Sequence, residues 1–368
     1  MDGNVNTSPL ELKTEAMLEV VVLCGGKSAE HDISLLSTAA VIGNLDTSKF
    51  TVSVIGIGRD GGTLPSGELR SLLKLAGSES IALPQTSDWV SYLRQLNPDR
   101  AVVFPVLHGP HGEDGTVQGL LELFGLPFVG PGVGGSAVGM NKIYCKSILR
   151  AAGLPVLPWV SLNREEWSKN SGKIVEVMES DLGYPVFVKP ANMGSSVGIN
   201  RSDDRLQIVE HVKTALEYDD YVLVEKGIAA REIEVAVLGS FEPQASVPGE
   251  IVPGDVFYSY EAKYLTEDSK LLIPAPLNSE QQSLLRDLAI EAFKVLQLDG
   301  LARVDFLLDK DSGEAWINEP NTIPGFTRIS MYPKLWEESG VPYSRLLERL
   351  IELGRQRHLR RSRFSVDR

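Results

Sequence analysis

The stretch Glu19-Val20-Val21-Val22-Leu23-Cys24-Gly25-Gly26 sets the fold class of the first third of the chain. Its apolar residues run without alternation and stop at two glycines, which is typical of a strand buried on both faces of a parallel sheet. Elements of alternating type are predicted downstream: a helix over 34–45, strands over 50–57 and 101–107, and a helix over 116–124. This alternation predicts an α/β unit with a mostly parallel sheet, whose ligands bind at the loops that follow the strands.

The glycine-rich segment 130–135 (GPGVGG) ends this unit, and two further units are predicted after it. The second has a helix over 136–152 and short strands over 185–189 and 221–225. The third has strands over 232–238, 301–308 and 315–319, and helices over 279–296 and 343–352. The predicted fold is α/β, with α+β character in its later part. Its boundaries are a flexible extension at 1–18, an α/β substrate domain at 19–130, a central subdomain at 131–225, a C-terminal subdomain at 226–354 and a basic tail at 355–368.

A long segment rich in proline and tyrosine, 248–277, lies between two predicted strands of the third unit. Irregular loops of this length inside compact domains are usually functional lids or disordered segments. We interpret it as a lid.

Composition limits the classes of partner. The 368 residues carry a formal net charge of −13, which disfavours nucleic acid because phosphate backbones select basic surfaces. No apolar run approaches the roughly 18 residues of a membrane helix, and the first residues lack the features of a secretory signal. The only cysteines are Cys24 and Cys145, so a reducing compartment is expected and the protein is predicted to be cytoplasmic, without a membrane partner. The C-terminal arginines are interpreted as a solvated helix end and frayed tail rather than a docking patch: Arg355, Arg357, Arg360, Arg361 and Arg363.

Oxygen-bearing side chains lie on two predicted neighbouring strands near the C-terminus. Asp305 lies in the first strand, and Glu319 and Asn321 end the second. Residues two apart point to the same face of a strand, so Glu319 and Asn321 can share a metal and Arg303 can align with Asp305. Hard oxygen donors suit Mg²⁺ bound together with nucleotide phosphates, and the apolar neighbours of Asp305 argue against a solvent-exposed strand edge.

A second group of polar residues suits a nucleotide. Lys189 ends the predicted strand 185–189, and a glycine/serine turn follows at 192–198 (NMGSSVG). A lysine and free backbone N–H groups bind phosphate oxygens. Glu225 and Glu232 lie at and just after the next strand, where carboxylates can accept hydrogen bonds from an adenine amino group and ribose hydroxyls.

Several motifs carry a family resemblance. KPANMGSSVG, VEKG, RVDF and NEPNT resemble the nucleotide and magnesium motifs of the ATP-grasp superfamily, whose members hold ATP between two α+β subdomains and activate a carboxylate as an acyl phosphate. The segments 24–34 (CGGKSAEHDIS), 108–116, 260–264 (YEAKY) and 324–327 (PGFT) are similar to those of the D-alanine–D-alanine ligase family. The resemblance spans about residues 19–353 in family order. It implies ligation of two D-alanines, with ATP, for peptidoglycan precursors, and a homodimer formed through the N-terminal domain.

The resemblance also implies roles for individual side chains. Glu30 binds the ammonium of the first D-alanine and forms a hydrogen-bonded trio with Ser195 and Tyr264. His108 flanks the first substrate, the alternative being a histidine satisfied within its own loop. Arg303 and the Gly325 N–H stabilise the oxyanion formed in the second step. Ser330 and the Met331 backbone hold the carboxylate of the second substrate.

The nucleotide and metal sites follow from the same resemblance. The phosphate-contacting lysines are Lys142, Lys189 and Lys263. The rest of the nucleotide site is Ser196, Glu225, Lys226, Ile228 and Glu232, and the metal ligands for two Mg²⁺ or Mn²⁺ ions are Asp305, Glu319 and Asn321.

Two alternatives stay open. A related ligase making D-alanyl-D-lactate or D-alanyl-D-serine shares most of these motifs, although Tyr264 within YEAKY argues against the D-lactate product. A catalytically silent nucleotide-binding protein would have lost part of the metal or arginine set, and none is missing. One departure is Pro320, which removes a backbone donor between two metal ligands and is expected to affect loop rigidity more than chemistry.

Overall fold

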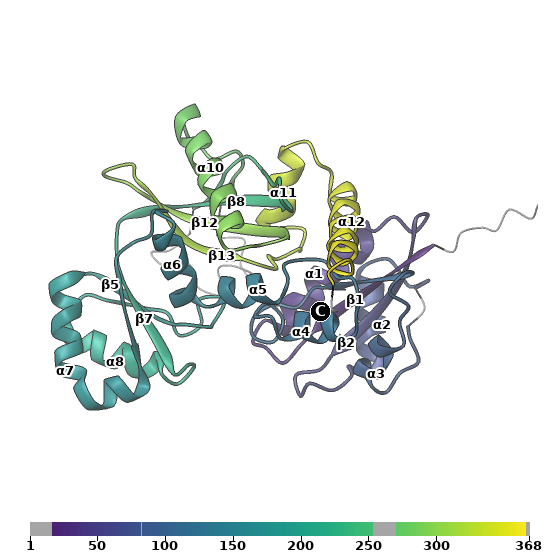
Figure 1. The fold of residues 1–368 in the computed structure, drawn as a ribbon, viewed down its shortest axis with the longest axis horizontal. Coiled ribbons are helices and arrows are strands. Elements are labelled where there is room, and N and C mark those ends of the chain that lie inside the picture. The colour runs from purple at the N-terminus through teal and green to yellow at the C-terminus, as the bar shows by residue number, and fades with distance from the viewer. Residues whose placement is uncertain (1–16, 82, 253–269, 366–368) are drawn as a thin grey trace, which may run out of the picture.

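The computed structural model describes residues 17–81, 83–252 and 270–365. These residues form a mixed α/β fold built on three sheets (Figure 1). In the view of Figure 1 the N-terminal sheet lies on the right, the central four-stranded sheet on the left, and the C-terminal sheet above and between them. The candidate site residues come from all three parts.

The N-terminal part has the predicted parallel sheet. β1 (Leu18–Gly25) is its central strand, with β2 (Phe50–Ile57) and β3 (Ala101–Pro105) parallel to it on either side. Val22 pairs with Val54 and Phe104 and is fully buried, which explains why this strand is apolar without alternation. The helices of this part are α1 (His31–Asn44), α2 (Ser66–Leu75), α3 (Trp89–Arg94) and α4 (Thr116–Leu123).

The single helix predicted over 136–152 is wrong, because two helices occupy this region. α5 (Val133–Met140) and α6 (Lys142–Ala151) are separated at Asn141, whose backbone is extended (φ −83°, ψ 106°). The Asn141 side chain accepts hydrogen bonds from the backbone N–H groups of Ile143 and Tyr144, so it caps α6. This cap fixes the start of α6 beside the candidate nucleotide site.

The central part contains a four-stranded antiparallel sheet in the order β4-β7-β5-β6. Its strands and helices are β4 (Trp159–Asn163), α7 (Arg164–Asp181), β5 (Val186–Pro190), β6 (Asn200–Ser202), α8 (Arg205–Ala215) and β7 (Tyr221–Lys226). Val188, Ile208 and Val224 belong to one buried cluster, so α8 packs on the sheet through apolar contacts.

The C-terminal part is a six-stranded sheet in the order β11-β10-β8-β12-β13, with β9 paired to β8. Its elements are β8 (Ala230–Gly239), β9 (Gln244–Ala245), β10 (Gly249–Val252), β11 (Lys270–Leu272), α10 (Ser279–Val295), β12 (Gly300–Asp309), β13 (Ala315–Asn321) and α11 (Met331–Glu338). The predicted irregular stretch 248–277 has strands at both ends, because β10 and β11 pair antiparallel. Residues 253–269, with Lys263 and Tyr264, lie outside the described residues.

The last helix, α12 (Tyr343–Arg361), runs further than predicted and packs beside the N-terminal part (Figure 1). Leu346 and Leu350 share a buried cluster with Phe104 of β3. The expectation that the basic residues from 355 onward are solvated is wrong for Arg357, which is only 6% exposed. Arg357 donates hydrogen bonds to the carbonyl oxygens of Phe128 and Gly130, and its guanidinium lies 3.9 Å from the centre of the Phe128 ring. These polar partners make its burial tolerable.

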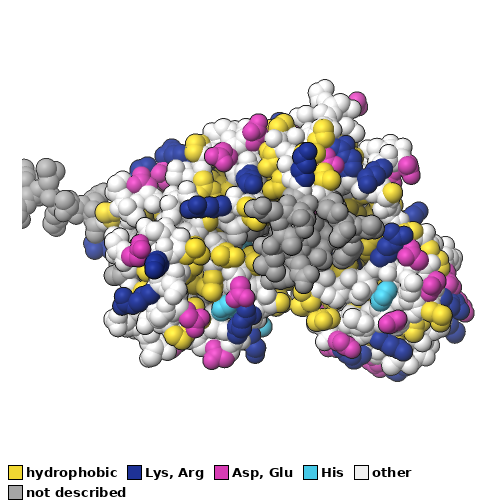
Figure 2. Space-filling view, turned by 180° about the vertical axis from the view of Figure 1, so that it is seen from behind, with side chains coloured by type: hydrophobic (Ala, Val, Ile, Leu, Met, Phe, Trp, Pro, Cys, Tyr) yellow, Lys and Arg dark blue, Asp and Glu magenta, His cyan; other side chains and the backbone are white. Residues whose placement is uncertain are grey.

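Charged side chains of both signs are interspersed over the face seen in Figure 2. In the part of the chain that the structure describes, no helix is long and apolar enough to cross a membrane.

Candidate active site

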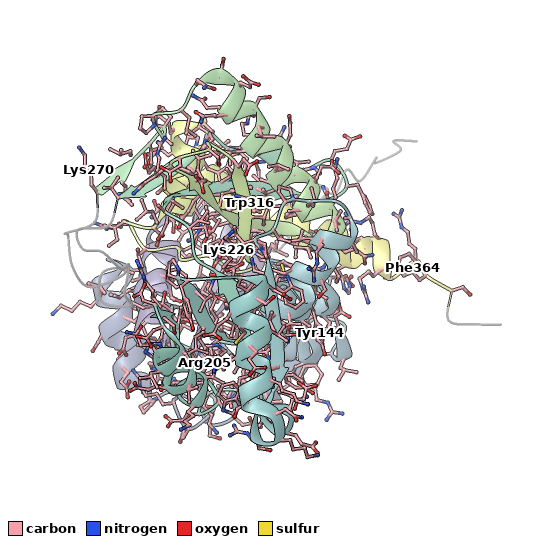
Figure 3. The ribbon with its side chains drawn as sticks, turned by 90° about the vertical axis from the view of Figure 1, so that its left-hand side faces the viewer. Tyr144, Arg205, Lys226, Lys270, Trp316 and Phe364 are labelled. Carbon is pink, nitrogen blue, oxygen red and sulfur yellow. The ribbon has the colours of Figure 1, made fainter. Side chains whose placement is uncertain are left out.

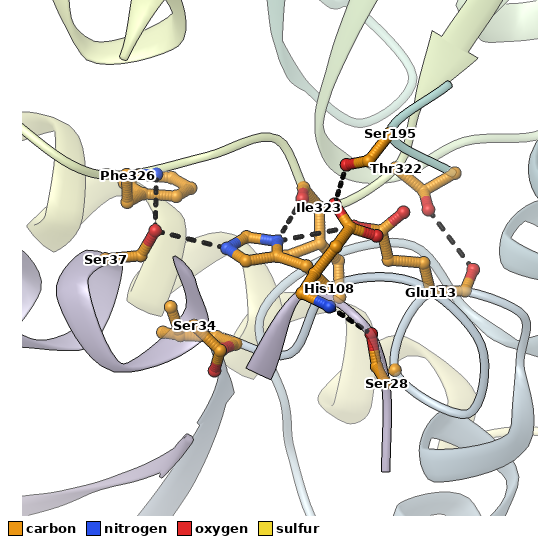
Figure 4. Close-up of polar contacts among 12 residues, drawn as sticks. Ser28, Ser34, Ser37, His108, Glu113, Ser195, Thr322, Ile323 and Phe326 are labelled. Carbon is orange, nitrogen blue, oxygen red and sulfur yellow. Dashed lines mark hydrogen bonds and ion pairs between the residues drawn. The ribbon is translucent and has the colours of Figure 1, made fainter. Parts of the chain in front are cut away.

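The Glu30 carboxylate lies where the N-terminal and central parts of the chain meet. Glu30 immediately precedes α1 and is 6% exposed. Ser195, on the glycine/serine turn after β5, donates a hydrogen bond to Glu30 Oε1 (Figure 4). The backbone approaches this carboxylate closely, because a Cβ added at Gly109 or Gly194 would lie 2.7 or 3.0 Å from Glu30 Oε2, and Gly109 also has a positive φ of 76°. The predicted Glu30–Ser195 contact is therefore present, while Tyr264 of the same trio lies outside the described residues.

The turn that carries Ser195 has unusual backbone geometry. Ser195 and Ser196 have φ values of 48° and 60°, in the left-handed region that L-residues rarely adopt. Such a conformation persists only where the surrounding structure holds it, and it occurs often in ligand-binding loops. The turn is held on one side by Asn192, whose backbone N–H and side-chain amide both donate to Asp219 Oδ2, at 2.8 and 2.7 Å.

His108 is buried and hydrogen-bonded on both ring nitrogens (Figure 4). Its Nδ1 lies 3.3 Å from Glu113 Oε1 and 3.1 Å from the Ile323 carbonyl oxygen, and its Nε2 lies 3.1 Å from Ser37 Oγ. Burial lowers the pKa of His108, but its hydrogen bond to Glu113 and that residue's charge hold the pKa above its usual value. His108 thus ties its loop to the segment after β13.

Glu113 is a buried acid that the sequence interpretation did not single out. Burial raises its pKa to about 7, and the negative charge of Glu30 acts in the same direction while His108 opposes it. Its backbone carbonyl accepts a hydrogen bond of 3.2 Å from Thr322 Oγ1. A carboxyl group with this pKa can change protonation near neutral pH.

Asp305 and Glu319 face each other across the antiparallel pair β12–β13, and Arg303 faces Asn321 in the same register. Both Asp305 oxygens lie 2.7 Å from Arg303 nitrogens, and Asn321 Nδ2 donates to Asp305 Oδ2 at 2.8 Å. The same Arg303 Nε that contacts Asp305 also lies 3.0 Å from the buried Glu234 of β8. The structure therefore brings together the predicted strand-end residues and adds Glu234.

Lys142 connects α6 to β13. Its Nζ lies 3.3 Å from Glu319 Oε2 and donates to the Met193 carbonyl oxygen at 2.6 Å. Lys142 also starts α6, where its backbone N–H donates to the Ala191 carbonyl oxygen at 2.9 Å. A predicted phosphate-contacting lysine and a predicted metal ligand are thus neighbours.

Lys189 and Glu225 form a buried ion pair on neighbouring strands β5 and β7. Lys189 Nζ donates to Glu225 Oε2 at 2.7 Å, and the other carboxylate oxygen, Oε1, contacts the ammonium of Lys146 from α6. Each Glu225 carboxylate oxygen thus has one lysine partner and keeps a second lone pair, which is the acceptor that an adenine amino group needs.

The other predicted nucleotide residues lie close to this ion pair along the chain. Lys226 ends β7 and is exposed (Figure 3), and its backbone N–H donates to the Pro158 carbonyl oxygen at 3.0 Å. Ile228 and Glu232 are partly buried, and Glu232 contributes charge to the surroundings of Lys189.

Gly325, Ser330 and Met331 belong to the segment that leads from β13 into α11. A Cβ on Gly325 would lie 2.9 Å from Ser330 Oγ, so the backbone there approaches Ser330 closely. Ser330 Oγ accepts a hydrogen bond of 2.9 Å from the Thr327 N–H, and Met331 is buried at the start of α11. Phe326 N–H donates to Ser37 Oγ at 3.3 Å, which joins this segment to α1.

Three residues of the site were missed from the sequence: Lys146, Glu113 and Glu234. Lys146 lies four residues after Lys142, one helical turn away on the same face, and Glu234 lies two residues after Glu232 on one strand face. Glu113 lies within the segment 108–116 that supported the family resemblance. The sequence shows these spacings, but it does not show the partners, far along the chain, against which each charged side chain is buried.

The chemistry of Asp305, Glu319 and Asn321 fits a divalent cation. Two carboxylates and an amide oxygen, on adjacent strands, are the hard donors that Mg²⁺ and Mn²⁺ prefer. Within the described ranges, no group of three or more histidine, cysteine, aspartate and glutamate side chains is placed to hold a metal ion.

Known proteins match the chain over nearly its whole length. Residues 19–131 match the family model described as D-ala D-ala ligase N-terminus, and residues 148–352 match the one described as D-ala D-ala ligase C-terminus. The D-alanine–D-alanine ligase of Heliobacterium modesticaldum is 47% identical over 359 residues, covering 95% of this chain and 98% of the relative. The D-alanine–D-alanine ligase of Natranaerobius thermophilus is 46% identical over 360 residues, with coverage of 95% and 98%.

Solved structures give the same result. The D-alanine–D-alanine ligase from Coxiella burnetii has a TM-score of 0.78 at 38% identity, over 94% of this chain and 96% of that one. The VanG D-Ala:D-Ser ligase from Enterococcus faecalis has a TM-score of 0.79 at 33% identity, over 92% and 100%. With both halves matched in order and the fold shared, the chain belongs to the D-alanine–D-alanine ligase family.

Proposed function

We propose that the protein joins two D-alanines to D-alanyl-D-alanine, with conversion of ATP to ADP and phosphate. The observation that carries the proposal is the buried Glu30 carboxylate, which contacts the turn that follows the Lys189 strand. This arrangement holds a site for an ammonium group beside a site for phosphates. Relatives that are 46–47% identical over 95% of the chain bear the name of this activity.

The first step needs a D-alanine carboxylate close to the γ-phosphate. Glu30 binds the substrate ammonium, and Ser195 orients the Glu30 carboxylate through its hydrogen bond. A substrate carboxylate oxygen attacks the γ-phosphorus, the bond to the β-phosphate oxygen breaks, and D-alanyl phosphate and ADP result. Holding both reactants in place contributes much of the rate, because the step becomes effectively unimolecular.

Positive charge stabilises this transfer. Lys142 and Lys189 both precede the turn 192–198 in the chain and bind phosphate oxygens, together with Lys263 and the backbone of Ser196. Lys226, Ile228 and Glu232 complete the nucleotide site. When bound by Asp305, Glu319 and Asn321, Mg²⁺ or Mn²⁺ neutralises charge on the phosphates.

The second step forms the peptide bond. The amine nitrogen of the second D-alanine attacks the carbonyl carbon of D-alanyl phosphate, phosphate leaves, and the amine loses one proton. Arg303 and the Gly325 N–H stabilise the oxyanion, and Ser330 and the Met331 backbone hold the second carboxylate. Arg303 is preorganised by Glu234 and Asp305, which contact it at 3.0 and 2.7 Å.

The product is a cell-wall precursor, made in the cytoplasm by a homodimer that assembles through the N-terminal part. D-serine is the competing second substrate, because the VanG D-Ala:D-Ser ligase has the same fold over 92% of this chain. Phosphate release from ATP, measured with and without D-alanine, tests the proposal. Release that depends on D-alanine supports it, and release that is absent or independent of amino acid contradicts it.

A further inference from the structure

Two buried lysines share one buried carboxylate beneath the proposed nucleotide site. Lys146 and Glu225 are each 1% exposed, and Lys189 is 8% exposed. Lys146 contacts Glu225 Oε1, and Lys189 contacts Glu225 Oε2 at 2.7 Å. The three residues come from α6, β7 and β5, so tertiary structure and not local sequence assembles them. Lys146 has no part in the function proposed above.

Opposite charges lie close together in this cluster. Burial raises the pKa of Glu225, but the charges of Lys146 and Lys189 hold it below the usual value. Burial lowers the pKa of Lys189, yet Glu225 holds it above the usual value. Within the three residues, two ammonium groups and one carboxylate sum to one positive charge, and the charges of Glu319 and Glu232 also act on Lys189.

The position of Lys146 makes that net charge available to a ligand. Without Lys146, Lys189 and Glu225 would form a neutral pair, and moving the Lys189 ammonium toward a phosphate would leave a bare buried carboxylate. With Lys146 in place, Glu225 keeps a partner when Lys189 turns away. Lys189 Nζ also has a second contact, with Asn318 Oδ1 at 3.4 Å.

We propose that Lys146 is a positioning residue for nucleotide binding: by pairing with Glu225, it releases the Lys189 ammonium to bind phosphate. This inference rests on the proposed function, because it needs Lys189 to face the nucleotide phosphates. It assigns Lys146 no contact with the nucleotide. Its role is electrostatic: it supplies the positive charge that pairs with Glu225 when Lys189 turns to the phosphates.

The experiment compares five proteins by calorimetric titration with ATP and with ADP: wild type, Lys146→Met, Lys146→Arg, Glu225→Gln and the double variant Lys146→Met/Glu225→Gln. We expect Lys146→Met to bind both nucleotides about tenfold or more weakly, since a nearby unit charge at low effective dielectric has an effect of at least that size. Lys146→Arg should recover most of the affinity. Because Glu225 itself belongs to the proposed nucleotide site, the double variant is compared with Glu225→Gln and not with the wild type. In that pair Lys146→Met should weaken binding much less, because no carboxylate is left to hold Lys189.

Adenosine provides the control ligand, and Lys213→Met provides the control variant. Adenosine has no phosphate, so its affinity, measured by competition with ATP, should be similar in the wild type and Lys146→Met. Lys213 is an exposed lysine of α8, and its replacement should change neither ligand's affinity. A general distortion of the site would weaken adenosine as well as ATP.

Each outcome decides between the electrostatic role and a structural one. Unchanged ATP affinity in Lys146→Met overturns the proposal, as does equal weakening of adenosine. Weakening by Lys146→Met that is as large in the Glu225→Gln background as in the wild type also overturns it, because Lys146 would then act independently of Glu225. If Lys146→Met does not fold, the Glu225→Gln pair decides: a loss of about tenfold or more between Glu225→Gln and the double variant overturns the proposal. Failure of the proposed function is seen separately, as wild-type protein that binds no ATP or releases no phosphate with D-alanine.

Discussion

At the scale of single residues, the protein places ionisable groups where water cannot solvate them. Glu113 and His108 are the clearest pair, because both are buried and they lie 3.3 Å apart. Burial shifts the pKa of each group, each group shifts the pKa of the other, and the negative charge of Glu30 raises both pKa values. Buried groups of this kind make stability depend on pH.

Glu113→Gln should make folding stability less dependent on pH. Glu113 has a pKa raised from 4.5 to about 7 by burial, so the stability it contributes is full below pH 4.5 and is lost as the pH rises through about 7. The raised pKa of His108 acts in the same direction from 6.5 upward. Urea unfolding of the variant and the wild type between about pH 5 and about pH 8 should show the variant gaining relative stability with pH. A stability difference that is constant over this range contradicts the prediction.

Glu319→Gln should abolish most turnover while leaving the fold intact. The amide keeps the size of the side chain but removes a full charge beside Lys142 and the proposed metal, and electrostatic terms of this kind contribute roughly 10²-fold or more to kcat. Turnover at saturating Mg²⁺ and thermal unfolding measure the two effects. Near-normal turnover would remove Glu319 from the metal site.

At the scale of elements, strands were predictable and helix interruptions were not. The strand 50–57 was predicted with the bounds of β2, because apolar and polar residues alternate in its first half and its second half is apolar and buried. The break at Asn141 was missed, because the residues on both sides of it are helix-forming and the side-chain cap depends on three-dimensional geometry. Lys146 was missed for a related reason. A helical lysine is usually exposed, and the carboxylate that buries this one lies far along the chain.

Asn141→Ala should weaken both the fold and nucleotide binding. Asn141 caps α6, and its amide also donates to Asn192 Oδ1 at 2.8 Å, which links the lysine-bearing helix to the 192–198 turn. Loss of a helix cap costs about 1 kcal/mol, and displacement of Lys142 should raise KM for ATP several-fold.

The matched control is Asn163→Ala, which removes the cap of α7. Asn163 accepts from the Glu166 N–H at 2.8 Å and has no contact with the predicted site residues among the hydrogen bonds of the described chain. Its loss should lower the free energy of unfolding by a similar amount, with KM for ATP unchanged. Equal KM values in the two variants would show that the α6 cap has no bearing on the nucleotide.

At the scale of the whole molecule, α12 connects the C-terminal part of the structure to the N-terminal part. It follows the C-terminal sheet in sequence and packs against the N-terminal sheet, where Arg357 binds two carbonyls of the segment entering α5. Arg361 pairs with Glu122 of α4 at 3.0 Å and extends this contact, while Arg360 pairs with Asp299 of the C-terminal part at 2.8 Å. Within the basic run, Arg357 is therefore a buried contact between α12 and the N-terminal part.

Arg357→Met should destabilise the fold by about 2–4 kcal/mol, because two buried carbonyl oxygens lose their donors while the aliphatic volume is kept. Arg355→Met is the control. Among the described residues, Arg355 makes only an exposed ion pair with Glu352 at 3.6 Å, so this variant should change stability by less than about 0.5 kcal/mol. Denaturant unfolding of both variants measures the difference. Equal stabilities would mean that α12 is held by its apolar face alone.

The most direct test of the proposed activity is product analysis with the purified wild-type protein, ATP and Mg²⁺. D-alanine, D-serine and D-lactate are each supplied alone, and D-serine and D-lactate are also supplied in mixture with D-alanine. ADP formation is followed, and the products are identified by mass. We predict that D-alanine alone supports ADP formation and yields D-alanyl-D-alanine with one ADP for each peptide bond, and that this dipeptide dominates in every mixture. A mixed D-alanyl-D-serine or D-alanyl-D-lactate product that dominates in competition, or ADP formation that ignores D-alanine, would contradict the assignment.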